Sequence, residues 1–383
     1  MRNSVWHLAV YFALVMGMLT SCVQLGGESG PRTVVVDLEQ VSDQGLFSNV
    51  RSVCLETSEA SLLNYIENIL VYKDTIVIHS LFDNLVGFYT QDGSFVKKLT
   101  IGNGPDEILN PADVCLDRET GELWVLDRYT NSRAFSFEGK DLHKTITTDH
   151  GYMKLARMNG THMLFDSNMS KKNDYCYRFI RGDEEWNVVP KDKRFAQLLY
   201  IPTNTFAPLN DSITLCCQQF DDVVYSWNTK SNTLDTFLNF TYKGASSIAS
   251  WPGDYVIEHS RDSEYQSWYK NKEYVFGFKN MQVVDNRLFF TAAKDQQRYY
   301  TYDIDTWQIH GSNQLISGFP VVEKIYKGDG ATLLFTLKPH EIIEFVEANN
   351  KNKVHPLLIN LSGSLQEDDN PVLFIVDTKA SKS

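Results

Sequence analysis

The sequence predicts an all-β protein folded as a six-bladed β-propeller. Two observations carry this prediction: short apolar strand patterns return at intervals that are mostly 40–50 residues long, and aromatic residues make up 13% of the chain. Aromatic residues favour strands, and strand clusters that return at this period are typical of propeller blades. With 383 residues the chain is long enough for one large all-β domain.

Each copy of the repeat consists of an apolar strand run and an aromatic residue twelve positions further on. A polar turn separates the two, so we expect the aromatic residue to anchor the next strand. The six pairs are Ile76 and Phe88, Leu123 and Phe135, Met163 and Tyr175, Ile213 and Tyr225, Leu288 and Tyr300, and Leu333 and Phe345. Six copies predict six blades, because a small sheet buries both of its faces only by stacking against neighbouring sheets.

Two parts of the chain depart from the regular repeat. The interval between the fourth and fifth copies is 75 residues, which predicts a loop or helical insertion near residues 243–279. The ring must also close, because an open ring would leave an unpaired strand edge. We expect residues 33–36 or residues 50–55 to pair with residues 372–376 for this purpose.

The N-terminus has the pattern of a bacterial lipoprotein signal peptide. Arg2 supplies a positive charge, and the apolar stretch at residues 5–19 is shorter than the roughly 20 residues that a membrane span needs. The stretch ends in Leu19-Thr20-Ser21-Cys22, which resembles a lipobox. We therefore expect cleavage before Cys22 and acylation of this cysteine, which anchors the protein to a membrane.

This processing predicts three segments: a signal peptide at residues 1–21, a lipidated tether at residues 22–32, and the propeller at residues 33–383. The tether is small, polar and glycine-rich, as a flexible linker is. Val23, and not an aspartate, follows the cysteine. We therefore expect an outer-membrane lipoprotein that faces the periplasm, with the cell surface as the alternative.

The charge and the remaining cysteines narrow the classes of function. A formal net charge of −12 without any basic run argues against a nucleic-acid partner, because phosphate backbones bind to basic stripes. The other cysteines have irregular spacing and strand-like neighbours, so we interpret them as small buried apolar residues. They are Cys54, Cys115, Cys176, Cys216 and Cys217.

The stretch IGNGPDEILNP at residues 101–111 combines glycines, prolines and two acids. It lacks the third glycine and the helix of a dinucleotide-binding loop, and its acids would repel an anion. Adjacent acids diverge on an extended backbone, so they do not form an acid/base pair. We interpret the stretch as the crossing between the first and second blades, with Asp106 and Glu107 as candidate ligand-binding residues.

The turn at residues 127–133, DRYTNSR, is the most polar turn between two strands of the repeat. Asp and Asn form hydrogen-bonded turns, which is the structural interpretation. The functional alternative places this turn at the mouth of the propeller channel, where it contacts a carboxylate or a sugar. Its candidate ligand-binding residues are Asp127, Arg128, Tyr129, Asn131 and Arg133.

The chain resembles the six-bladed β-propeller lipoproteins of Gram-negative, polysaccharide-degrading gut bacteria, which are relatives of the NHL-repeat propellers. The resemblance covers about residues 50–377 and rests on four motifs: the lipobox with Cys22, residues 51–57 (RSVCLET), the IGNGPDEILNP loop, and residues 368–373 (DDNPVL). It implies an extracytoplasmic binding or scaffolding role.

These observations lead to one hypothesis and one alternative. The hypothesis is a lipid-anchored binding or scaffold protein without catalysis, whose ligand is a glycan, a peptide or an envelope protein. The alternative is a metal-dependent hydrolase or lyase with a Ca²⁺ or Zn²⁺ ion on the propeller axis, held by Asp, Glu, Asn or His from several blades. We assign no catalytic residue, metal ligand or cofactor from the sequence.

Overall fold

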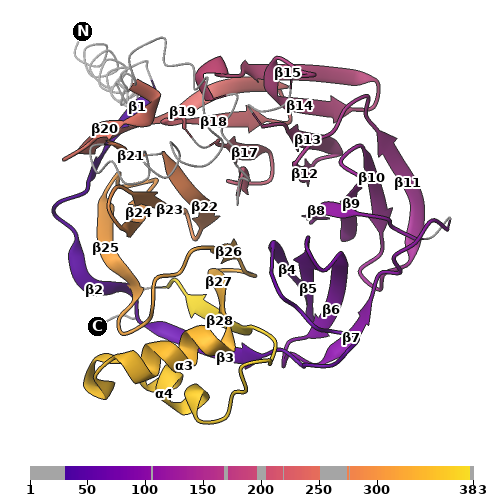
Figure 1. Ribbon diagram of the computed structural model, residues 1–383. Coiled ribbons are helices and arrows are strands. Elements are labelled where there is room, and N and C mark those ends of the chain that lie inside the picture. Colours follow the sequence, from indigo (N-terminus) through magenta and orange to yellow (C-terminus); the bar gives the residue numbers. More distant parts are fainter. Residues whose placement is uncertain are drawn as a thin grey trace, which may run out of the picture. The chain divides into compact units, whose positions relative to one another are not determined.

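The computed structural model describes residues 31–104, 107–167, 171–195, 204–218, 220–250, 274–275 and 277–379. Contacts divide the chain into two units, Met1–Arg32 and Thr33–Ser383. The second unit is a six-bladed β-propeller, as the repeat predicts: six sheets surround a central axis (Figure 1). The predicted signal peptide and Cys22 lie outside the described residues.

In each of the first three blades, four consecutive strands pair antiparallel, in chain order from the channel outward. Blade one contains β4 (Asn68–Tyr72), β5 (Thr75–Ser80), β6 (Leu85–Thr90) and β7 (Phe95–Lys98). Blade two contains β8 (Pro111–Asp117), β9 (Glu122–Asp127), β10 (Asn131–Phe135) and β11 (Asp141–Thr147). Blade three contains β12 (Lys154–Met158), β13 (Thr161–Phe165), β14 (Tyr175–Arg181) and β15 (Glu184–Pro190).

The last three blades each take their outermost strand from the N-terminal part of the propeller. Blade four contains β16 (Phe206–Pro208), β17 (Ile213–Cys216), β18 (Val223–Asn228) and β19 (Thr233–Lys243), with β1 (Arg32–Asp37) outside them. Blade five contains β22 (Phe278–Val284), β23 (Arg287–Ala293), β24 (Gln297–Asp303) and β25 (Ile309–Ile316), with β2 (Ser42–Phe47) added in parallel to β25. Blade six contains β26 (Tyr326–Lys327), β27 (Thr332–Leu337), β28 (Val372–Asp377) and β3 (Asn49–Cys54).

Blade six closes the ring. Its β3 pairs antiparallel with β28, with Val50 opposite Val376 and Val53 opposite Leu373. The expected pairing of residues 50–55 with residues 372–376 is therefore confirmed, and the alternative pairing of residues 33–36 is wrong. Those residues belong to β1, because its inward side chains, Val34 among them, are buried in the apolar core between blades four and five.

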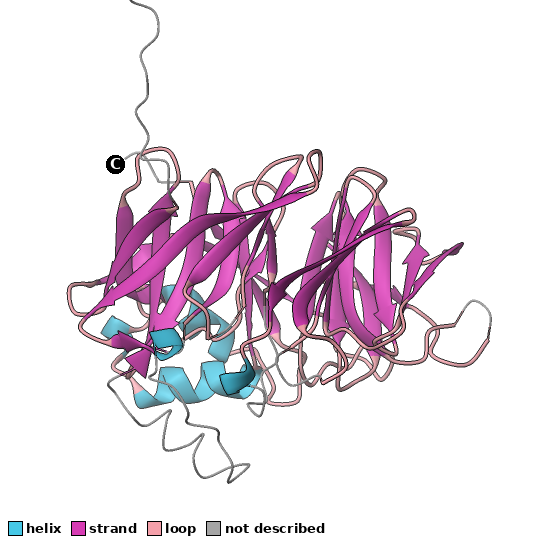
Figure 2. Ribbon diagram, turned by 90° about the horizontal axis from the view of Figure 1, so that it is seen from above, coloured by secondary structure: helices cyan, strands magenta, loops and turns pink. Residues whose placement is uncertain are grey.

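The strand connections give the ring two different faces. We call the crossing face the one that carries the connections from each blade to the next and from the second to the third strand of a blade. The hairpin face carries the tight turns between first and second and between third and fourth strands. Seen from the side, the two helices lie at one face of the ring (Figure 2).

All helical segments that the structure describes lie in connections of the crossing face. Helices α3 (Pro339–Ala348) and α4 (Pro356–Ser362), with the 3₁₀ turn η3 (Lys351–Lys353), stand between β27 and β28. The 3₁₀ turn η1 (Lys193–Phe195) stands between β15 and β16. The short pair β20 (Ser246–Ser247) and β21 (Tyr274–Val275), with the 3₁₀ turn η2 (Ile248–Ser250), stands between β19 and β22, and most of the insertion expected near residues 243–279 lies outside the described residues.

The first members of the six repeat pairs all lie in the second strands of the six blades. The aromatic partners lie in third strands in five blades, but Phe345 lies in α3, so the sixth pair is wrong. Helix α3 begins here because Pro339 occupies its first turn and the Glu341 carboxylate accepts the Lys338 N–H at 2.7 Å. It buries Ile342 against blades five and six. None of the described helices is long and apolar enough to span a membrane.

Candidate functional site

Glu107 holds the 101–111 loop in shape. The loop runs from β7, the outermost strand of blade one, to β8, the innermost strand of blade two, as predicted. The Gly104 N–H donates to Glu107 Oε2 at 2.7 Å, and the Gly102 N–H donates to the Ile108 carbonyl at 2.9 Å. A Cβ on Gly102 would clash with the Glu107 carboxylate, so a larger residue there would displace this carboxylate. Asp106 lies outside the described residues.

Asp127 fastens the same loop to blade two. It ends β9, its side chain is buried, and Oδ1 accepts the N–H groups of Leu109 at 3.1 Å and Asn110 at 2.7 Å. The next two residues, Arg128 and Tyr129, have φ angles of +53° and +64°, which turn the chain sharply into β10. The Asp127 carboxylate thus makes the hydrogen bonds that the structural interpretation of this turn expects.

Two arginines of the turn also contact the loop. Arg128 Nη2 donates to Asn103 Oδ1 at 3.0 Å. Arg133, in β10, donates to the Glu107 carbonyl and pairs with Asp141 of the outer strand β11. Loop and turn therefore form one hydrogen-bonded unit on the crossing face of blade two.

The remaining predicted residues belong to the same unit. Asn131 Oδ1 accepts the Thr147 hydroxyl at 3.0 Å, and the Tyr129 ring is exposed while its carbonyl accepts the Tyr152 N–H at 2.8 Å. The expected position at the channel mouth is wrong, because this turn joins the second and third strands, whereas the first strands line the channel. The structure thus brings the predicted residues together, but beside the channel.

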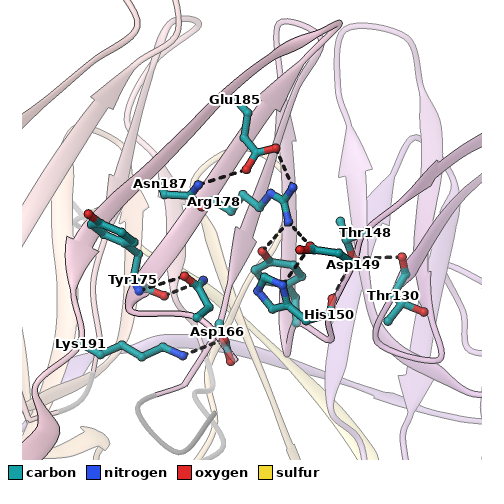
Figure 3. Close-up of polar contacts among 12 residues, drawn as sticks. Thr130, Thr148, Asp149, His150, Asp166, Tyr175, Arg178, Glu185, Asn187 and Lys191 are labelled. Carbon is teal, nitrogen blue, oxygen red and sulfur yellow. Dashed lines mark hydrogen bonds and ion pairs between the residues drawn. The ribbon is translucent and has the colours of Figure 1, made fainter. Parts of the chain in front are cut away.

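A second polar cluster lies where the chain crosses from blade two to blade three (Figure 3). Its centre is Arg178 of β14, which donates to Asp149 at 2.5 Å, to Glu185 at 2.6 Å and to the Tyr152 hydroxyl at 3.2 Å. The Arg178 guanidinium lowers the pKa of Asp149. The cluster adjoins the predicted turn, because the Tyr152 N–H bonds to Tyr129.

The central channel holds a cavity of about 150 Å³ that residues from the innermost strands of all six blades line. Asn68, Asp113 and Lys154 lie at the crossing-face end of their strands, where β4, β8 and β12 begin. Arg157 and Lys327 lie near the hairpin-face end of β12 and β26. The cavity therefore extends along the channel. Its crossing-face end is lined by an acidic and a basic side chain, and its hairpin-face end by basic side chains.

A buried charge network stands at the crossing-face end of the channel. Glu67 accepts Lys154 Nζ and Lys324 Nζ on its two carboxylate oxygens, each at 2.7 Å. Asp113 lies 3.8 Å from Lys154 Nζ and accepts the Leu155 N–H at 2.9 Å. The network ties together blades one, two, three and six across the axis.

The network favours the charged forms of Glu67 and Lys154. Burial raises the pKa of Glu67, but Lys154 and Lys324 outweigh it and bring this pKa below its ordinary value. Burial likewise lowers the pKa of Lys154, but Asp113 and Glu67 hold it above its ordinary value. Two cations and two carboxylates thus neutralise each other inside the protein.

Large exposed apolar side chains gather on the crossing face. Of the nine that the described residues expose, six lie in its loops or at the strand ends beside them: Leu62, Phe82, Ile101, Tyr129, Tyr175 and Val321. Phe82 is 70% exposed and stands edge-on to Tyr65, with ring centroids 5.1 Å apart. Lys324 Nζ lies 4.0 Å from the centroid of the Tyr65 ring, so the aromatic pair adjoins the charge network.

The alternative of a metal-dependent enzyme needs a ligand set on the axis. Within the described ranges no three His, Cys, Asp or Glu side chains stand together as a metal site would require. The two channel carboxylates, Glu67 and Asp113, have lysine neighbours instead.

Glu67, Lys154, Lys324 and Lys327 were not predicted from the sequence as site residues. One pattern could have pointed to the first three: each stands at, or just before, the start of an innermost strand, namely β4, β12 and β26. Aligned by blade, these positions reach the same level of the channel. The apolar pattern of the repeat is stronger in the second strands, which carry none of these residues.

The fold places the protein among the six-bladed β-propellers, and its sequence identifies the family within that class. The chain belongs to the family DUF4934, a domain of unknown function, which it matches over residues 33–377. No curated protein matches it.

One solved structure shares the fold, and a second one is less similar. A protein of Bacteroides fragilis that is provisionally classed as exported has 12% identity and a TM-score of 0.71, with 91% of this chain and 100% of that chain covered. A member of the DUF4221 family from Bacteroides vulgatus has 9% identity and a TM-score of 0.48, with 86% and 96% covered. At these identities the likeness concerns the fold alone.

Proposed function

We propose that this protein is a lipid-anchored, extracytoplasmic binding protein that docks a partner protein on its crossing face. The observation that carries the proposal is the concentration of exposed apolar side chains there, six of the nine in the described residues. Monomeric proteins rarely gather such side chains on one face without an interaction to cover them. The buried charge network beneath this face gives it a rigid base.

The kind of side chain favours a protein over a glycan. A sugar-binding platform uses ring faces, but Leu62, Ile101 and Val321 are aliphatic. They lie in the loops that lead into blades six, one and two, which are neighbours in the ring, so the apolar groups cover one arc of the crossing face. Aliphatic and aromatic groups with polar neighbours are typical of protein interfaces. Phe82 and the half-buried Tyr65 are the expected anchor, because aromatic side chains are frequent among the residues that dominate binding energy.

The sequence-predicted residues contribute to the rim of this surface. Tyr129 offers its exposed ring, while Arg128 and Asn131 offer polar groups around it. Glu107, Asp127 and Arg133 position the loop by the contacts described above. We therefore assign the first three to partner contact and the last three to shaping the loop.

The anchor rests on the lipobox that ends in Cys22. Two or three acyl chains there hold the protein stably on a membrane, and the tether of residues 22–32 separates the propeller from the lipid. The provisional classing of a protein of the same fold as exported agrees with this location. We place the protein in the outer membrane, facing the periplasm.

The docking surface is tested by photo-crosslinking in cells. A photoreactive phenylalanine replaces Phe82 or Leu62 on the crossing face, and Trp307, which is 58% exposed on the hairpin face, serves as the control position. We expect the same protein to be captured from both crossing-face positions and not from Trp307. The purified partner should then bind the Phe82→Asp variant about tenfold more weakly. Capture from Trp307 alone, or binding of a polysaccharide but no protein, would contradict the proposal.

The anchor is tested separately with a Cys22→Ser variant. We expect this variant to lose the acyl label and to leave the membrane fraction. The natural chain should carry the label and stay in the membrane fraction. A Cys22→Ser variant that stays acylated and membrane-bound would show that the anchor lies elsewhere. The two tests are independent, because one changes Cys22 and the other changes Phe82 or Leu62.

A further inference from the structure

The wall of the central channel carries the opposite charge to the rest of the protein. The chain as a whole has a net charge of −12. The cavity, however, is lined by four basic side chains and a single acidic one, Asp113. The basic residues are Arg118, Lys154, Arg157 and Lys327. Such an excess of one sign in an enclosed space focuses the potential on a ligand of the other sign.

Two of these cations are already neutralised. Lys154 is paired with Glu67, as described above. Arg157 Nε donates to the buried Asp117 at 2.7 Å. Both belong to the internal framework of the channel, so neither needs a ligand.

The other two cations are not satisfied in this way. Arg118 has only an exposed contact with Asp329 at 3.6 Å, in which the two side chains are 49% and 61% exposed. The half-buried Lys327 ammonium makes no ion pair or hydrogen bond with any described residue. Exposed pairs contribute little, and a partly buried unpaired ammonium is unfavourable. The free protein therefore keeps two positive groups near the hairpin-face end of the channel without firm partners.

A third polar group lines the same cavity, nearer its crossing-face end. Thr205 directly precedes β16, its side chain is 2% exposed, and its hydroxyl has no hydrogen-bond partner among the described residues. Buried hydroxyls almost always bond to protein or water, so this end of the cavity has room for a water molecule or another polar group.

We propose that the central channel binds a small oxyanion, carried by a carboxylate, sulfate or phosphate group, and that Lys327 and Arg118 neutralise it. This site is separate from the docking surface on the crossing face. A cavity of about 150 Å³ holds a ligand of about six heavy atoms, the size of benzene. A small carboxylic acid or an inorganic oxyanion fits that volume, whereas a polymer does not.

The electrostatics of Lys327 agree with this assignment. Burial lowers its pKa, and the neighbouring Arg118 lowers it further, while Asp329 offsets only part of this. A bound oxyanion would raise that pKa again by supplying further negative charge. Affinity should therefore fall as the pH rises through the lowered pKa of Lys327.

The experiment is isothermal titration calorimetry on the purified full-length chain in a Tris chloride buffer of low ionic strength. The probes are lactate, sulfate and phosphate, and neutral lactamide is the control ligand. We expect at least one oxyanion to bind with a Kd below about 1 mM, and lactamide not to bind. Lactate alone would identify a carboxylate site, and sulfate or phosphate alone an inorganic oxyanion site.

Four variants locate the site. Lys327→Gln and Arg118→Gln should each weaken binding by about tenfold, and Lys327→Arg should bind within about threefold of the natural chain. The matched control is Lys98→Gln, which removes an exposed lysine of β7 far from the cavity lining and should leave binding unchanged. Arg118 is half exposed, so its variant is expected to fold even if Lys327→Gln does not.

Two results would overturn the proposal. One is the absence of heat for all three oxyanions at about 10 mM, a concentration at which even a weak site fills. The other is equal weakening by Lys98→Gln and Arg118→Gln, which would mean general attraction to surface charge. The docking surface is unaffected by either result, because its test uses no channel residue.

Discussion

The Glu67→Gln variant tests the buried charge network most directly. Glutamine keeps the shape of the side chain but removes the negative charge that lies between two lysines. Lys154, whose side chain is 6% exposed, is then left with Asp113 at 3.8 Å as its only carboxylate neighbour among the described residues. The variant therefore creates an undercompensated charge in the interior without creating a cavity.

The expected loss of stability follows from burial and from the remaining partners. Removing one partner of a buried ion pair costs about 3–5 kcal/mol, because the other charge stays buried. Asp113 still compensates part of the charge on Lys154, and Lys324 is 20% exposed and can reach water. We therefore expect the lower end of this range, a decrease of about 3 kcal/mol in the free energy of unfolding.

The assay is equilibrium unfolding in urea at pH 7, followed by tryptophan fluorescence. Glu347→Gln is the control, because Glu347 is exposed on α3, and it should change stability by less than about 0.5 kcal/mol. The double variant Glu67→Gln/Lys154→Met should regain about 1–2 kcal/mol over Glu67→Gln, since the uncompensated ammonium is gone. A loss below about 1 kcal/mol, or a double variant that is less stable than the single one, would refute this account.

The same pair of proteins gives a prediction for pH. The folded-state pKa of Glu67 lies below the ordinary value of 4.5, so its contribution to stability is fully present above that pH. It is lost as the pH falls below 4.5 through the lowered pKa. The stability difference between the natural chain and Glu67→Gln should therefore be constant near neutral pH and shrink in acid. A difference that grows in acid would contradict the sign.

Three further predictions concern single contacts. Asn370→Ala should lower the free energy of unfolding by about 3 kcal/mol in urea titrations, because the buried amide bonds the Leu63 N–H at 2.7 Å and the Glu56 carbonyl at 2.7 Å. Gly93→Ala should cost about 1–3 kcal/mol in the same assay, because φ is +90° and a Cβ would clash with the backbone of the closing strand. Glu107→Ala should leave the fold intact but remove hydrogen-exchange protection at the Gly104 amide, and unchanged protection would mean that the carboxylate does not hold the loop.

The sequence predicted the parts of the fold that depend on local patterns. Six apolar runs, such as the one around Leu123, mark the second strands of six blades, because a strand buried on both faces is apolar throughout. The loop after β7 was placed correctly as a crossing between blades. The same reasoning failed at Phe345. In blade six, 34 residues separate β27 from β28, so the third strand does not begin about twelve residues after the second-strand position, as it does in the other blades.

The candidate site was predicted only in part. Glu107 and Asp127 were singled out as polar residues in glycine-rich or turn-rich segments, and the structure shows them bonded to the loop backbone. Their distance along the chain is short, so their proximity was accessible to sequence reasoning. Lys327 could not be predicted as a site residue, because a single lysine after a tyrosine forms no recognisable pattern.

The sequence by itself determined the number of blades, the second strand of each blade and the crossing loop between the first two blades. Each of these depends on the pattern and spacing of apolar residues within some tens of positions. Such local patterns can be recognised because the geometry of a strand fixes which side chains share a face. Only the tertiary structure decided that β3 and not β1 closes the ring, and that Glu67 meets Lys324, 257 positions away. Such contacts depend on the closure of the whole ring, which brings six innermost strands, and the charges at their ends, around one axis.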